Sequence, residues 1–129
     1  MADRDEVRTD EAPAPFRGAP YSQGIRVGGL VFVSGQVAID PTTNSFAGGS
    51  LSEQAERVFA NVSAILMAAG SSLDRIVKTT VYLADLDQFD AMNEVYAKHV
   101  GQPAPARTTI EASRLPAGAL IEIDVIAQA

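Results

Sequence analysis

The sequence predicts an α+β domain in which two helices cover one face of a mixed β-sheet, with the element order β-β-α-β-α-β-β. Two segments repeat apolar residues at helical spacing, and the segments around them are short and rich in β-branched residues. A strand, a helix and a further strand favour a parallel, right-handed crossover, whereas closely spaced strands at the two ends of the order suit antiparallel hairpins. Together these patterns predict the mixed sheet.

Residues 1–15 mix charged residues with alanine and proline, and we expect a flexible segment or an arm on the surface there. A single domain is expected over residues 16–129. Residues 24–38 predict two short strands around a Gly-Gly pair, which suits a tight hairpin turn. Residues 40–50 hold proline, asparagine and paired glycines, so they predict turns.

The first helix is predicted over residues 52–69, where apolar side chains recur at i, i+3, i+4 and i+7. Ser50 and Glu53 have the spacing of a capping box at its start, and Gly70 suits its end. The β-branched residues of 75–84 then predict a strand.

The second helix is predicted over residues 86–100, with Asp87 as the candidate N-cap. Its inner face would consist of Phe89, Met92 and Tyr96. A glycine and a proline follow directly, and both residue types end helices.

The last two strands are expected over residues 106–113 and 119–127, and the loop between them leaves their register open. If these strands pair, Arg107 and Glu122 could come close. They could form a structural ion pair, or Arg107 could bind a ligand carboxylate while Glu122 orients or deprotonates a water. Asp124 reads as a solvated or interface acid.

Composition excludes several kinds of chemistry. The chain has 129 residues, a formal net charge of -6 and a pI near 4.6, which argues against non-specific nucleic-acid binding. It has no cysteine and one histidine, His99, so we expect neither thiol chemistry nor a metal site. The N-terminus lacks the apolar core of a secretion signal, and no run approaches the roughly 18 apolar residues of a membrane span. We therefore expect a cytoplasmic protein that does not contact membranes.

Two helices leave the second face of the expected sheet uncovered, although that face also looks apolar. "LVFV" (30–33) shows no polar alternation, and residues 120–126 carry only two acids among apolar side chains. Because a soluble protein rarely exposes so large an apolar area, we expect a homo-oligomer that covers it. A site at the open edge of the sheet could then be shared by two chains.

Four segments and their spacings resemble the RidA/YjgF family of imine and enamine deaminases: "GAPYSQG" (18–24), "VFVSGQVAIDP" (31–41), "IVKTTVYLADLDQFDAMNEVYAKH" (76–99) and "PARTTIEASRLPAGALIEIDVIA" (105–127). The resemblance implies a chorismate-mutase-like fold and a homotrimer with clefts between subunits. It also implies hydrolysis of 2-aminoacrylate and related 2-imino acids, which arise from pyridoxal-phosphate enzymes, to 2-keto acids and ammonia. No cofactor or metal is implied.

The resemblance further implies the roles of individual residues. Arg107 matches the arginine that binds the substrate carboxylate, and Glu122 matches the acid that positions the attacking water. Thr109 stands where many members carry cysteine, so no thiol can act there. The positions that match the substrate-binding residues are Tyr21, Ser34, Gly35, Asn93 and Thr109.

Three other functions stay open at this point. Some family members are described as endoribonucleases or translation inhibitors, but the acidic charge and single histidine of this chain give that function little support. A non-catalytic, ligand-binding trimer would be favoured by loss of the family arginine, and Arg107 is present. A specialised deaminase of aminoacrylate from pyrimidine breakdown, or of aminomuconate, is the third.

Overall fold

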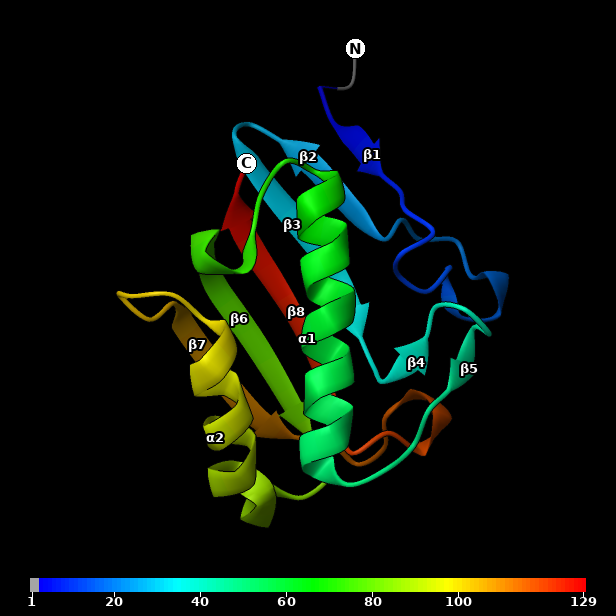
Figure 1. Ribbon diagram of the computed structural model, residues 1–129, viewed down its shortest axis with the longest axis vertical. Helices are drawn as coiled ribbons and strands as arrows, with labels where there is room; N and C mark the ends of the chain where they lie inside the picture. The colour runs from blue at the N-terminus through cyan, green and yellow to red at the C-terminus, as the bar shows by residue number, and fades with distance from the viewer. Residues whose placement is uncertain (1–2) are drawn as a thin grey trace.

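The computed structural model describes residues 3–129 and has two helices packed on one face of a six-stranded sheet (Figure 1). The strand order across the sheet is β1-β2-β3-β8-β6-β7, and β4 and β5 form a separate short hairpin. The helices and strands are β1 Asp5–Val7, β2 Gly24–Val27, β3 Leu30–Gln36, β4 Ile39–Asp40, β5 Ser45–Phe46, α1 Leu51–Ala68, β6 Ile76–Leu83, α2 Phe89–His99, β7 Ala106–Glu111 and β8 Ile121–Gln128, with single 3₁₀ turns η1 Phe16–Gly18, η2 Leu73–Arg75, η3 Leu86–Gln88 and η4 Pro116–Gly118.

The last strand of the chain, β8, lies inside the sheet and pairs antiparallel with β3 on one side and β6 on the other. The predicted hairpin of residues 106–113 with 119–127 is therefore wrong, because β6 separates β7 from β8. The composition of β8 explains its place. Ile121, Ile123 and Val125 are fully or almost fully buried in the helix-covered core, and such a strand gains most at the centre of a sheet.

Two of the predicted strand pairings are confirmed. β6 and β7 are parallel neighbours joined through α2, as a crossover requires. β2 and β3 form the predicted antiparallel hairpin. Its turn residues Gly28 and Gly29 have φ angles of 56° and 79°, which only glycine adopts without strain.

Helix α1 begins and ends where its sequence predicts. The Ser50 side chain accepts a hydrogen bond from the Glu53 amide, and the Glu53 carboxylate accepts one from the Ser50 amide, which completes the capping box. Gly70 follows the last turn with a φ of 81°. The buried face of α1 consists of Leu51, Gln54, Ala55, Val58, Phe59, Asn61, Val62, Ile65 and Leu66.

Helix α2 differs from its prediction in two respects. The Asp85 carboxylate, rather than Asp87, accepts the hydrogen bond that starts this segment, and the bond comes from the Asp87 amide. Met92 and Tyr96 are buried as predicted, but Phe89 is 40% exposed because it lies in the first turn of α2, at the margin of the core.

The structure places residues 3–15 against the sheet. β1 pairs antiparallel with β2, and Val7 and Ala12 are buried in the main core. Hydrogen bonds from the Gln23 side chain to the carbonyls of Ala12 and Pro13 hold the following loop. The segment therefore contributes a strand that the sequence did not predict, and residues 40–50 likewise contain the small β4–β5 hairpin.

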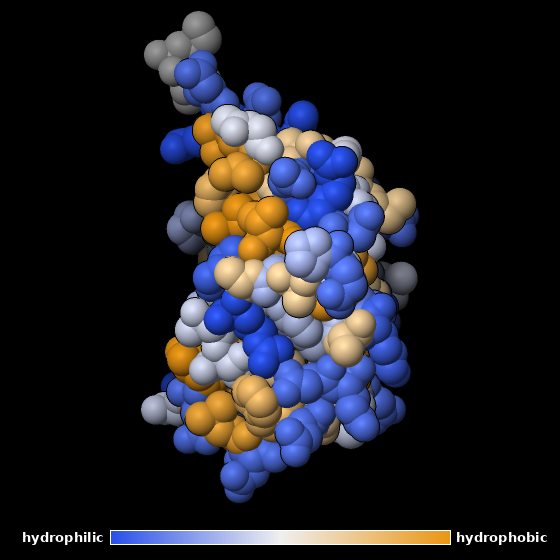
Figure 2. Space-filling view, turned by 90° about the vertical axis from the view of Figure 1, so that its left-hand side faces the viewer, coloured by the Kyte–Doolittle hydropathy of each residue, from blue (hydrophilic) through white to orange (hydrophobic). Residues whose placement is uncertain are grey.

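The other face of the sheet carries no helix. Figure 2 shows hydrophobic side chains gathered toward that side of the molecule, while hydrophilic ones dominate over the helices. Val27, Phe32 and Ile110 are 37%, 39% and 42% exposed there. We call this surface the open face. It matches the uncovered apolar face that the sequence predicts.

Candidate active site

The site lies where the pairing of β3 with β8 becomes irregular. The register between these strands shifts between Val33 and Gln36, so Ser34 and Gly35 lie in an irregular stretch at the strand end. The Ser34 amide donates to the carbonyl of Gln23, and its hydroxyl donates to the carbonyl of Ser22 at 2.6 Å. With its proton held by a carbonyl and no histidine beside it, Ser34 is a positioning group rather than a nucleophile.

Gly35 lies directly against the carboxylate of Glu122 on β8. A Cβ atom at position 35 would overlap Oε2 of Glu122, and it would also press on the Glu122 carboxyl carbon. The absence of a side chain at Gly35 therefore lets the acid reach the end of β3. This contact gives a physical reason for glycine at a position that the sequence assigned to the site.

A cavity of about 320 Å³ opens at this point. It brings together four of the predicted site residues, Tyr21, Ser34, Gly35 and Glu122, and among residues 3–129 Glu122 is the only charged residue in its lining. Its remaining walls are mostly apolar and come from Pro13, Ala14, Phe16, Ala19, Val37, Ile39 and Pro116, with Gln36.

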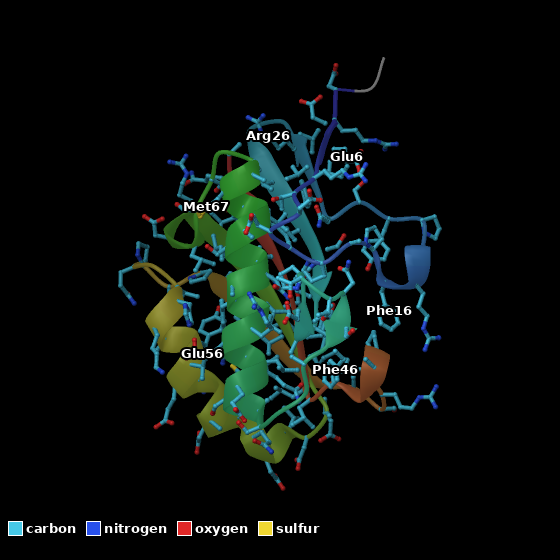
Figure 3. The ribbon with its side chains drawn as sticks, turned by 45° about the vertical axis from the view of Figure 1, so that its right-hand side comes forward. Glu6, Phe16, Arg26, Phe46, Glu56 and Met67 are labelled. Atoms are coloured by element: carbon cyan, nitrogen blue, oxygen red, sulfur yellow. The ribbon has the colours of Figure 1, made fainter. Side chains whose placement is uncertain are left out.

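The N-terminal loop forms one wall of the cavity. The Tyr21 hydroxyl accepts a hydrogen bond of 2.6 Å from the Phe16 amide, which ties the two aromatic residues into one unit. Phe16 and Phe46 both pack against a small second core of Val37, Ile39 and Ala119 (Figure 3). Tyr21 is thus held by the fold, although it stays 41% exposed.

Glu122 is half-buried, and its environment favours the protonated form. Burial raises the pKa of Glu122, and the nearby charge of Asp124 raises it further. No basic side chain forms an ion pair with either acid within residues 3–129. A carboxyl group with such a raised pKa can exchange a proton with a bound molecule more readily than an exposed glutamate can.

Arg107 lies on the opposite, helix-covered face of the sheet. Its strand partner is Thr79, which is fully buried under the helices. Nη1 of Arg107 donates to Oδ1 of Asn93 at 2.8 Å, and the guanidinium carbon lies 4.7 Å from the ring centre of Tyr96 and 5.4 Å from that of Phe89. Helix α2 therefore fixes the arginine through a hydrogen bond and two cation–π contacts.

The predicted site residues consequently form two groups within one chain. Arg107, Asn93 and Thr109 belong to β7 and α2 and do not line the cavity that contains Glu122. The expectation that Arg107 and Glu122 approach each other through paired strands is wrong for a single chain, because β6 lies between β7 and β8. Arg107 makes no ion pair within residues 3–129.

Sequence reasoning missed the apolar walls, and the structure narrows the prediction for Asp124. Val37 and Ile39 could have been suspected, because they lie two and four residues after Gly35, the glycine that interrupts β3. Pro116 belongs to the loop of undetermined register. Asp124 is half-buried and accepts a hydrogen bond of 3.0 Å from the Tyr82 hydroxyl, so it is not a freely solvated acid.

Two further findings concern residues 3–129. None of their helices combines the length and apolar character needed to cross a membrane. They also contain no group of three or more His, Cys, Asp and Glu side chains placed to hold a metal ion.

Comparison with known proteins places this chain in a family. The family model described as Endoribonuclease L-PSP matches residues 9–129. Reactive Intermediate Deaminase A, a chloroplastic protein of Arabidopsis thaliana, is 44% identical over 124 residues, which cover 96% of this chain and 65% of that protein. The crystal structure of RidA from the Antarctic bacterium Psychrobacter sp. PAMC 21119 is 41% identical, with a TM-score of 0.91 and coverage of 97% of this chain and 99% of that one.

The crystal structure of E. coli TdcF with bound serine is 36% identical, with a TM-score of 0.87 and coverage of 97% of this chain and 98% of that one. The long matches, the shared fold and the family name of the relatives agree. The chain belongs to the RidA/YjgF family and has its α+β, chorismate-mutase-like fold.

Proposed function

We propose that the protein is a hydrolytic deaminase that converts 2-aminoacrylate and related 2-imino acids to 2-keto acids and ammonia. The observation that carries the proposal is the Glu122 carboxyl, which lies half-buried with a raised pKa in a small cavity whose other walls are largely apolar. The name of the Arabidopsis relative supports deaminase activity, and the serine bound to TdcF supports a ligand of amino-acid size in this fold.

We also propose that the protein is a homotrimer in which each active site is completed by two chains. In one chain Glu122 and Arg107 lie in separate places, and Arg107 has no acidic partner within residues 3–129. The open face of the sheet exposes Val27, Phe32 and Ile110, which a neighbouring copy would cover. A neighbour that brings its Arg107 and Asn93 to the cavity would supply the missing carboxylate-binding group.

The division of roles follows from these residues. The Arg107 guanidinium donates two parallel hydrogen bonds to the substrate carboxylate and so fixes C2 of the substrate. Asn93 holds one edge of that guanidinium, while Tyr21 and the apolar walls enclose the side chain of the substrate. Glu122 holds a water against C2, where the imine carbon is already electrophilic, so no covalent nucleophile is required.

The reaction of the imine proceeds in two steps, and 2-aminoacrylate enters it as its tautomer 2-iminopropanoate, formed when a proton moves from its nitrogen to C3. The water oxygen forms a bond to C2 while the C=N π pair moves to nitrogen, and one water proton passes through Glu122 to that nitrogen to give a carbinolamine. The carbinolamine hydroxyl proton then passes through Glu122 to the nitrogen, the C–N bond breaks, and C=O forms with release of ammonia. Glu122 ends each step as the carboxylate with which it began.

The deaminase proposal is tested with imino acids generated in situ from several amino acids. The wild-type protein should accelerate ammonia release, and Glu122→Gln should lower kcat more than it raises KM, because it keeps the shape but loses the proton-accepting group. Exhaustive chelation should leave the rate unchanged. Absence of any acceleration across the panel would contradict the proposal.

A second candidate is RNA cleavage, which the description of the matched family model favours. His99, the only histidine of the sequence, lies between the helices and away from the cavity, with Nε2 2.6 Å from Oε1 of Glu56 and its ring stacked on Phe59. Purified protein freed of nuclease contaminants should therefore leave RNA intact. Cleavage that Glu122→Gln abolishes would favour the second candidate instead.

A further inference from the structure

Three polar groups from two adjacent strands meet on the open face beside the cavity. Glu122 and Asp124 lie two residues apart on β8 and so point to the same side of the sheet. On β6, Tyr82 is the direct strand partner of Glu122, and its hydroxyl reaches diagonally to donate to Oδ2 of Asp124 at 3.0 Å. Tyr82 thus stands next to one carboxyl and holds the other.

This cluster has no cation of its own within residues 3–129. The nearest lysine along the same face of β6 is Lys78, and its ammonium group donates to the carbonyl of Thr79 and the hydroxyls of Thr80 and Thr108 instead. Tyr21, from the N-terminal loop, lines the same cavity as Glu122. The charge that acts on Glu122 from its own strand is therefore that of Asp124.

The two contacts of the cluster have different effects. The Tyr82 hydroxyl donates to Oδ2 of Asp124 and holds that side chain in place beside Glu122. The negative charge of Asp124 makes a second negative charge at Glu122 unfavourable. The raised pKa of Glu122, caused first by burial and then by Asp124, agrees with this geometry.

We propose that Asp124 and Tyr82 are positioning residues that enable Glu122 to carry the proton from the attacking water to the leaving nitrogen. This inference rests on the proposed deaminase function. In each step of the reaction Glu122 accepts one proton and returns it. A strongly acidic carboxyl is a poor proton acceptor, so the charge of Asp124 beside Glu122 makes the first half of the transfer easier, and the Tyr82 hydroxyl holds the Asp124 side chain in place.

A purely structural role predicts a different outcome. A tyrosine–aspartate hydrogen bond across two strands also stabilises the sheet, and its loss would then lower stability without moving the pH dependence of catalysis. The pH profile of kcat/KM separates the two roles, because its acid limb reports the pKa of the essential base in the free enzyme.

The experiment compares the pH profiles of wild type, Asp124→Asn, Tyr82→Phe and the double variant. Glu122 must be ionised to accept a proton, so kcat/KM falls as the pH drops through its pKa. Asp124→Asn removes the like charge and should move the acid limb to lower pH, with a loss of roughly two- to fivefold in kcat on the plateau. Tyr82→Phe removes the hydrogen bond that holds Asp124 beside Glu122 and should move the limb in the same direction by a smaller amount.

The double variant should follow Asp124→Asn, because Tyr82 acts through Asp124. Glu94→Gln is the control. It removes one negative charge from an exposed position of α2, on the other side of the sheet, and should keep the wild-type pH profile. Tyr82→Phe keeps the ring and serves as the second test if Asp124→Asn does not fold. An acid limb at the wild-type pH in both single variants would overturn the proposal.

A measurement without turnover separates this inference from the proposed function. The Glu122 carboxyl can be titrated by carboxyl-carbon NMR in wild type and in Asp124→Asn. A lower midpoint in the variant supports the coupling even if the wild-type protein shows no deaminase activity, in which case the proposed function alone has failed. Equal midpoints refute the coupling.

Discussion

At the scale of single residues, Gly35 determines whether Glu122 can reach the cavity. A methyl group at this position would overlap the carboxylate, and the acid would have to move away from the end of β3. We expect Gly35→Ala to displace the Glu122 carboxyl at little cost in stability, because the atoms that the methyl group meets belong to the end of a flexible side chain, and to lower kcat by tenfold or more. Steady-state kinetics and denaturant unfolding measure both effects. Wild-type kcat in a folded Gly35→Ala protein would show that Glu122 need not stand where the structure places it.

Arg107 is the second residue on which the proposed chemistry depends. Arg107→Ala removes two charge-assisted hydrogen bonds to the substrate carboxylate, and at about 1.5–3 kcal/mol each this corresponds to a loss of roughly 10²–10⁴ in kcat/KM. Arg107→Lys should recover little of it, because an ammonium group cannot reproduce the fork. Arg26→Ala is the control, because Arg26 is an exposed arginine of β2 that does not line the cavity. A wild-type rate for Arg107→Ala on 2-iminopropanoate would reduce Arg107 to a structural role.

At the scale of elements, helix α1 supports the cavity from behind through a buried amide. Asn61 is fully buried, and its Nδ2 donates to the carbonyls of Val37 at 3.3 Å and Ile39 at 3.0 Å, which belong to the turn that forms the apolar wall. This contact ties the packing of α1 to the shape of the site.

Asn61→Leu should leave the buried Ile39 carbonyl without the Asn61 donor, while the Val37 carbonyl keeps its hydrogen bond from the Ile39 amide. We expect a loss of about 2 kcal/mol or more in the free energy of unfolding, together with a larger rise in KM than fall in kcat, because the wall and not the reacting groups would shift. Ser63→Ala on the same helix is the control for a change in helix composition. An unaltered KM in the Asn61→Leu protein would show that α1 does not determine the shape of the cavity.

The elements also show how far the sequence predicts this protein. Apolar periodicity and caps fixed α1 to within one residue at each end, since these signals act within one segment. The position of β8 could not be predicted in the same way. Periodicity shows which side of a strand is buried, but its neighbours are chosen by packing between distant segments. For that reason the sequence named Arg107 and Glu122 but placed them on adjoining strands, which the order of the sheet excludes.

The N-terminal strand and the cavity walls were missed for a related reason. β1 is three residues long and mostly exposed, so its composition resembles that of a surface segment, and only the burial of Val7 against the core distinguishes it. The walls come from four loops or strand ends that have no common sequence signal. The family resemblance identified the polar residues of the site, whereas the residues of the apolar walls could be identified only from the fold.

At the scale of the whole molecule, the open face predicts self-association. Light scattering or ultracentrifugation at micromolar concentration should give about three times 13.6 kDa. Phe32→Lys, which places a charge on the open face, should yield smaller species. A stable, soluble wild-type monomer would contradict the shared site and would require another cover for this face.

The central claim is that one chain supplies Glu122 and its neighbour supplies Arg107, and mixing two inactive variants tests it most directly. Arg107→Ala and Glu122→Gln chains are co-expressed, and the mixed oligomers are assayed for deamination beside each variant alone. A cleft whose cavity comes from an Arg107→Ala chain and whose arginine comes from a Glu122→Gln chain contains both wild-type groups, and random assembly makes about one quarter of the clefts of this kind. The account predicts that activity returns to about a quarter of the wild-type value. Mixed oligomers that stay as inactive as the separate variants would show that both residues must come from the same chain, and would contradict it.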